Sequence, residues 1–147
     1  MSETIIQVTS LGKRIKGKTI LEDISFEINQ GDCVALIGPN GAGKTVLMSC
    51  ILGDKKPSSG QVLIDGKAGK AKNKIAVLLQ ENTIPNSLKV EELIAFFQSI
   101  SDNPLTNQEV QELLQFKEDQ YQQFADKLSG GQRRLLAFVL CLIDKPK

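Results

Sequence analysis

The sequence contains no histidine and no tryptophan, and only 5% of its 147 residues are aromatic. Without histidine the chain has no serine–histidine or cysteine–histidine catalytic pair, no histidine-ligated metal and no histidine pH switch. The cysteines Cys33, Cys50 and Cys141 form no CxxC pair, so we expect buried single thiols in a reducing compartment. The longest apolar run, residues 135–143, is about half as long as a membrane span.

The charges nearly cancel, with 18 basic and 17 acidic side chains. This balance removes the electrostatic argument for binding nucleic acid, and no nucleic-acid partner is expected. The composition changes after Gln80, because residues 1–80 hold 11 basic and 7 acidic side chains whereas residues 81–147 hold 7 basic and 10 acidic. The length predicts one domain with two differently composed parts.

The first part carries strand patterns. Residues 19–29 nearly alternate, with Ile20, Glu22 and every second residue to Ile28 on one face, which predicts a half-buried antiparallel strand. Residues 33–37 and 75–79 are continuous apolar runs, typical of strands buried on both faces. The other elements expected here are a strand in the opening stretch at 5–8, a helix at 44–52, a short strand at 61–65 and a solvated lysine-rich loop at 67–74.

The second part shows helical spacing, at Val90, Leu93, Ile94 and Phe97 and again from Val110 to Leu114. Thr106 is an expected N-cap with Glu109 at the capping-box position. A last helix is predicted from about 131 to 143, ending before Pro146. The run 138–144 could instead be a strand ending in Asp144, but its helical spacing favours the helix.

Residues 38–45 read GPNGAGKT, which matches the phosphate-loop pattern G-x-x-x-x-G-K-[ST]. Glycines allow consecutive backbone N–H groups to curl around a polyphosphate, and the following helix N-terminus favours negative charge. Lys44 is expected to reach the β- and γ-phosphates of a nucleotide, and the Thr45 hydroxyl to bind Mg²⁺. The residues expected to hold the nucleotide are Gly38, Pro39, Asn40, Gly41, Ala42, Gly43, Lys44, Thr45 and Val46.

Residues 128–132 read LSGGQ. Ser129 offers a hydroxyl, Gly130 and Gly131 offer exposed amides, and Gln132 lies in the first turn of the predicted helix, so this segment is a second candidate anion cradle. Two such cradles in one chain suggest a site completed by a second copy. Arg133 and Arg134 are expected to be solvated helix charges rather than catalytic groups.

Together the two motifs resemble the ATP-binding cassette (ABC) ATPase family, in which LSGGQ is the signature sequence. The resemblance implies an α/β fold of the P-loop NTPase type, with an antiparallel β subdomain, a partial parallel core sheet and a helical subdomain. It implies one domain over 1–147, comprising a β-rich and P-loop core at 1–80, the helical subdomain at 81–130 and the signature helix at 131–147. The C-terminal part of the core is expected to be missing.

The resemblance also implies a function, that of the ATP-binding subunit of a transporter. Gln80 would begin the Q-loop and contact Mg²⁺ or the attacking water, so Lys44 and Gln80 are the expected catalytic residues. Ser129 and Gly131 would contact ATP bound to a second subunit in a head-to-tail dimer. The expected partner is a transmembrane permease, with the protein cytoplasmic and peripheral to the membrane. The helical subdomain resembles export-type subunits in style.

Two features of the family pattern have no match. No apolar strand ending in Asp-Glu, the Walker B motif, follows the signature helix, so no catalytic carboxylate is assigned and hydrolysis by this chain alone is expected to be poor. No aromatic residue lies in the segment 12–19, where the family stacks adenine; Arg14 or Ile15 could substitute. The alternatives are a soluble ABC ATPase that has no membrane partner, and a catalytically incomplete nucleotide-binding module.

Overall fold

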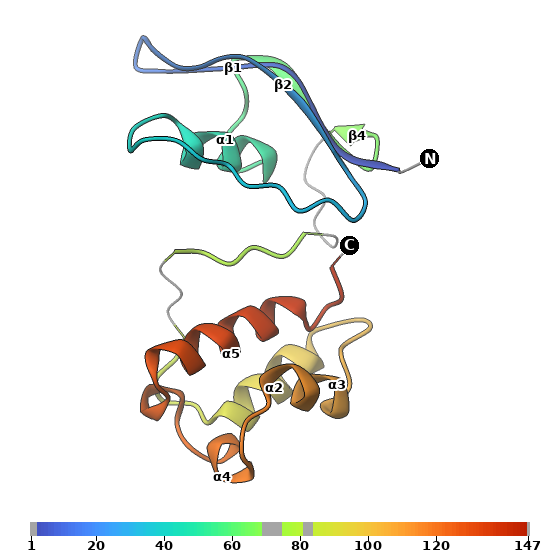
Figure 1. Ribbon diagram of the computed structural model, residues 1–147, viewed down its shortest axis with the longest axis vertical. Coiled ribbons are helices and arrows are strands. Elements are labelled where there is room, and N and C mark those ends of the chain that lie inside the picture. The colour runs from blue at the N-terminus through green and yellow to red at the C-terminus, as the bar shows by residue number, and fades with distance from the viewer. Residues whose placement is uncertain (1–2, 69–74, 81–83, 147) are drawn as a thin grey trace. The chain divides into compact units, whose positions relative to one another are not determined.

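The computed structural model describes residues 3–68, 75–80 and 84–146. Its backbone divides into two compact units, Met1–Ala71 and Lys72–Lys147 (Figure 1). Each unit has a hydrophobic core of its own. Residues 75–80 therefore belong to the same unit as the helices that follow them. No helix in the described ranges combines the length and the apolar character needed to cross a membrane.

The first unit contains a four-stranded antiparallel sheet with the strand order β2-β1-β3-β4. β1 (Thr4–Ile15) and β2 (Lys18–Asn29) form a long hairpin, and β3 (Ser59–Ile64) pairs with the other edge of β1. These strands confirm the strands predicted at 5–8, 19–29 and 61–65, of which only 19–29 was predicted to be antiparallel. β4 (Lys67–Ala68) is a short strand where a loop was predicted, and the rest of that predicted loop, 69–74, lies outside the described residues.

The pattern of buried residues in β2 changes at Asp23. From Ile24 onward alternate residues turn inward as predicted, but before it Leu21 is buried and Glu22 is exposed. Asp23 has a left-handed φ of 48°, and the pairing with β1 shifts register on the opposite strand between Leu11 and Lys13. This bulge inserts an extra residue and reverses the alternation. The prediction that Glu22 lies on the buried face is therefore wrong.

Helix α1 (Lys44–Ile51) covers one face of this sheet (Figure 1) and confirms the predicted helix. Its buried side chains pack against residues of the two long strands, which removes apolar surface from water on both sides of the contact. The buried members of this core are Val8, Leu11, Leu21, Leu47, Cys50 and Ile51. The packing fixes the first turn of α1 close to β2.

The two segments predicted as buried parallel strands are not strands in the described structure. Residues 33–37 lie between β2 and α1 without strand pairing, and Ile37 is 90% exposed. Residues 75–79 are also unpaired, with Leu79 60% exposed. A parallel strand needs neighbouring strands and covered faces, and no described strand pairs with either segment. Cys33 is consequently exposed, contrary to the prediction of three buried thiols.

The second unit is helical, as predicted. Its elements are α2 (Val90–Ser99), α3 (Asn107–Leu114), α4 (Glu118–Tyr121), the 3₁₀ turn η1 (Ala125–Lys127) and α5 (Gly130–Leu142). α5 is the predicted last helix, so the strand interpretation of the run 138–144 is wrong. The helices enclose a core whose completely buried members include Val90, Leu93, Val110, Leu136, Val139 and Ile143.

The predicted capping box of α3 is present. Thr106 Oγ1 accepts a hydrogen bond from the Glu109 amide at 3.2 Å, and Glu109 Oε2 accepts one from the Thr106 amide at 2.7 Å. These bonds to Thr106, with the ammonium of Lys145 at 3.7 Å, hold the pKa of Glu109 below its ordinary value. Because the unfolded chain then binds the proton more readily, the stabilisation is present above the unfolded pKa of about 4.3 and is lost as the pH falls through the folded value.

We therefore expect Glu109→Gln to make the stability of the helical unit less sensitive to acid. The measurement is the urea midpoint, followed by circular dichroism between about pH 7 and about pH 3. Glu112→Gln, on the same helix but away from its first turn, is the matched control and should keep the wild-type acid sensitivity. Equal acid sensitivity in the Glu109 variant and the wild type would contradict this account.

Candidate nucleotide-binding site

The phosphate loop, residues 38–46, curls tightly before α1. Gly41 and Gly43 have left-handed φ values of 84° and 90°, and the Ala42 amide donates to the Pro39 carbonyl at 3.3 Å. Left-handed backbone is strained for side chains other than glycine, so the glycines of this motif allow the curl. The loop itself lies on the surface, whereas Val46 is half-buried against the core below it.

Gly43 fixes the loop against the sheet. A Cβ atom at this position would lie 2.9 Å from Leu21 Cδ2 and 3.2 Å from the Ile20 carbonyl oxygen, so only glycine fits without displacement. The same residue is the N-cap of α1, and its carbonyl accepts the Leu47 amide at 2.8 Å. The sheet and the helix thus position the loop together.

Lys44 lies across the loop rather than pointing into solvent. Its Nζ donates to the carbonyl oxygens of Gly38 at 2.5 Å and Pro39 at 2.7 Å, which holds the ammonium group at the start of the loop. The next residue, Thr45, is exposed, and no hydrogen bond within the described residues engages its hydroxyl. A cation and a hydroxyl therefore stand side by side where the helix begins.

The first turns of the helices separate into two groups by charge. α2, α3 and α4 each carry one or two carboxylates there, whereas the first turns of α1 and α5 carry none. The amides of a helix N-terminus attract negative charge, and a carboxylate in the first turn satisfies part of that attraction. In α1 and α5, the two helices that follow the predicted anion cradles, no first-turn carboxylate satisfies this attraction.

The LSGGQ segment, residues 128–132, forms the N-terminus of α5. Ser129 Oγ accepts the Gln132 amide at 3.2 Å, and Gln132 Oε1 accepts the Ser129 amide at 3.0 Å, so the two side chains form a capping box. Gly130 and Gly131 are exposed, and a Cβ at either position would meet nothing within 4 Å. The described residues give no internal reason for glycine there, which leaves room for an external group to approach the backbone.

Gln80 and the two arginines of α5 belong to the same unit as the LSGGQ segment. Gln80 is exposed, and its carbonyl oxygen accepts Arg134 Nη1 at 3.1 Å. Arg133 Nη2 donates to the Asp126 carbonyl at 2.9 Å in the turn before the LSGGQ segment. Both arginines lie on α5 and Arg134 is exposed, but each guanidinium also binds a backbone carbonyl, which was not predicted. The sequence pattern alone contains no signal for these contacts.

The predicted site residues belong to two different units. The phosphate loop is complete within the first unit, whereas Gln80 and the LSGGQ segment are in the second. In the first unit the only aromatic residue is Phe26, which packs against the core, so that unit offers no free ring for a base. Arg14 is exposed and Ile15 half-buried at the end of β1, beside the Lys16–Gly17 turn.

The local geometry fits a nucleotide with its magnesium ion. The curled backbone, the carboxylate-free helix N-terminus and the ammonium of Lys44 suit a polyphosphate, since phosphates bind at such helix N-termini. Mg²⁺ is commonly bound through few protein ligands together with substrate phosphates. The exposed Thr45 hydroxyl can serve as such a ligand.

Comparison with known proteins identifies relatives of the chain. The family model described as ABC transporter matches residues 21–147. The methionine import ATP-binding protein MetN of Legionella pneumophila (strain Paris) is 35% identical over 97% of this chain and 46% of its own length. The spermidine/putrescine import ATP-binding protein PotA of Protochlamydia amoebophila is 33% identical over 93% of this chain and 39% of its own length. The chain thus spans less than half of these relatives.

A solved structure shows the same fold. The subunit cbiO1 from Clostridium perfringens, part of the ABC transporter complex cbiONQ, superposes with a TM-score of 0.81 at 24% identity, over 99% of this chain and 63% of that one. The P-loop ABC fold class is confirmed by this match. The predicted export-type character is not supported, because both curated relatives are named import subunits. With its family model matched over residues 21–147, this chain belongs to the ATP-binding domain family of ABC transporters.

Proposed function

We propose that the chain binds Mg-ATP through residues 38–46 and presents its LSGGQ segment to ATP bound by a second copy. The observation that carries the proposal is the curled loop with Lys44 held at its opening, followed by a helix without first-turn carboxylates. The LSGGQ segment adds a second helix of the same kind. In a head-to-tail pair each nucleotide would meet one cradle from each copy.

Each residue has a distinct part in this proposal. The loop amides would bind the phosphate oxygens, Lys44 would exchange its two carbonyl partners for the β- and γ-phosphates, and Thr45 and Gln80 would contact Mg²⁺. ATP supplies the phosphoryl group whose transfer to water releases energy. No residue is assigned as the catalytic carboxylate. We therefore propose that this chain alone binds ATP but hydrolyses it slowly.

The proposed partner is a transmembrane permease, with the chain at the cytoplasmic face of the membrane. Relatives that are named for import favour that direction of transport.

The Gly131→Asp variant tests the shared site. Aspartate at the first turn of α5 should stabilise the helix by about 0.3–1 kcal/mol through its dipole, and the site has room for a side chain. The same carboxylate should repel a phosphate brought by a second copy. We expect unchanged Mg-ATP binding by calorimetry, an unchanged or higher melting temperature, and loss of the ATP-dependent dimer in sedimentation velocity.

Gly130→Ala is the control for the mere presence of a side chain, since its Cβ also enters open space without adding charge. It should retain more of the dimer than Gly131→Asp. An ATP-dependent dimer of wild-type strength in the aspartate variant would exclude the shared site. A wild-type chain that binds no Mg-ATP would exclude the nucleotide site itself.

A further inference from the structure

The extended residues 77–80 are held along α5 by side chains of that helix. Cys141 Sγ donates to the Val77 carbonyl at 3.3 Å, and Arg134 Nη1 donates to the carbonyls of Leu79 and Gln80, both at 3.1 Å. Burial raises the pKa of the Cys141 thiol, which keeps it in its donating form. Positions 134 and 141 are two helical turns apart and thus share one face of α5.

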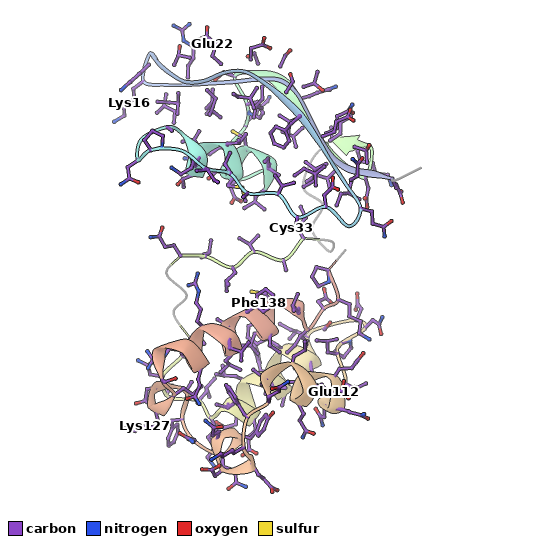
Figure 2. All side chains as sticks on the ribbon, viewed as in Figure 1. Lys16, Glu22, Cys33, Glu112, Lys127 and Phe138 are labelled. Carbon is purple, nitrogen blue, oxygen red and sulfur yellow. The ribbon has the colours of Figure 1, made fainter. Side chains whose placement is uncertain are left out.

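Few other interactions hold this segment. Leu78 packs against the core of the helical unit, but within the described ranges no backbone hydrogen bond joins residues 77–80 to another element. Figure 2 shows the side chains of α5 and labels Phe138, which lies between Arg134 and Cys141 in the sequence. The carbonyls of Leu79 and Gln80 therefore depend on one guanidinium.

The two neighbouring arginines have separate tasks. Arg133 binds the Asp126 carbonyl, in the turn that precedes the LSGGQ segment. Arg134 binds the carbonyls of Leu79 and Gln80. Both follow the cap at Ser129 within about a turn and a half of a rigid helix. A displacement of the cap is consequently passed to both backbone contacts.

We propose that Arg134 is a positioning residue that fixes Gln80 to the helix of the LSGGQ segment. This inference rests on the proposed function, in which Gln80 contacts Mg²⁺ bound at the phosphate loop. In it Gln80 moves as part of the unit that carries the LSGGQ segment rather than with the unit that carries the loop.

The contact of Arg134 with the carbonyls of Leu79 and Gln80, here called the clamp, can be tested without nucleotide by backbone NMR relaxation of the full chain. In wild type the order parameters of Leu79 and Gln80 should resemble rigid backbone, at about 0.85. In Arg134→Met, which keeps the length and helix propensity of the side chain, they should fall below about 0.6. Arg133→Met is the matched control and should leave residues 79–80 ordered. Unchanged order parameters in Arg134→Met would overturn the clamp.

The functional part is tested by the gain in ATP affinity that Mg²⁺ gives. Gln80→Ala and Arg134→Met should each reduce this gain by roughly three- to tenfold, the worth of one hydrogen bond, and the double variant should lose no more than either alone. Additive losses would overturn the positioning role. A wild type without Mg-ATP binding would overturn the proposed function and this role with it, while the NMR result would still decide whether the clamp exists.

Discussion

Lys44→Ala is expected to abolish measurable Mg-ATP binding by the chain. Among the described residues the Lys44 ammonium bonds two loop carbonyls, an arrangement that an arriving polyphosphate can replace with stronger acceptors. Hydrogen bonds to charged groups are worth about 1.5–3 kcal/mol each, so losing two of them predicts a fall in affinity of at least about 100-fold. Titration calorimetry of the full chain with Mg-ATP measures the effect.

The matched control for this substitution is Lys55→Ala. Lys55 belongs to the same unit and follows α1 rather than preceding it, so its loss changes the net charge equally without touching the loop. Its affinity for Mg-ATP should stay within about twofold of wild type. If the Lys44 and Lys55 variants bound nucleotide equally well, residues 38–46 would not be the phosphate site.

Gly60→Ala is expected to destabilise the first unit by about 2–4 kcal/mol, through overpacking added to backbone strain. Gly60 has a left-handed φ of 71°, and a Cβ there would overlap the carbonyl groups of Thr9 and Ser10. Because these are backbone atoms of the neighbouring strand, no side-chain rotation relieves the overlap. Cys50 is a buried thiol of the same core. In the variant it should become reactive at lower urea concentrations than in wild type.

Gly66→Ala separates strain from crowding. Gly66 has nearly the same φ, 69°, but a Cβ there would meet nothing within 4 Å. The control should lose only the cost of left-handed backbone, about 1 kcal/mol. Thiol labelling of Cys50 in a urea series, quantified by peptide mass spectrometry, gives both values. Equal shifts for the two variants would show that the contact with β1 is not crowded.

The elements predicted correctly are those whose signals are local. The capping box at Thr106 and the helix that begins at Gly130 depend on residues within one turn of each other, so periodicity and capping chemistry suffice. The tight curl of residues 38–46 was predictable for the same reason, since its glycines and Lys44 act within a few residues, whereas phosphate binding there stays a prediction.

The predictions that were wrong depend on partners distant in sequence. Residues 33–37 have the composition of a buried strand, but burial requires neighbouring strands that the described residues do not supply. The bulge at Asp23 arises from register with β1, which alternation alone does not reveal. The contact of Arg134 with a backbone 54 residues away was not predicted at all, because a charged residue in a helix gives no indication of such a contact.

The exposed state of residues 33–37 bears on how strongly the adjoining loop can hold a ligand. On its helical side the loop is anchored by the core, but on the other side it is joined to a stretch without neighbours in the sheet. A ligand that needs both flanks in place binds with its intrinsic affinity multiplied by the share of molecules already in that state. Pairing residues 33–37 with a neighbouring strand would therefore raise the affinity for nucleotide without adding any contact to the nucleotide.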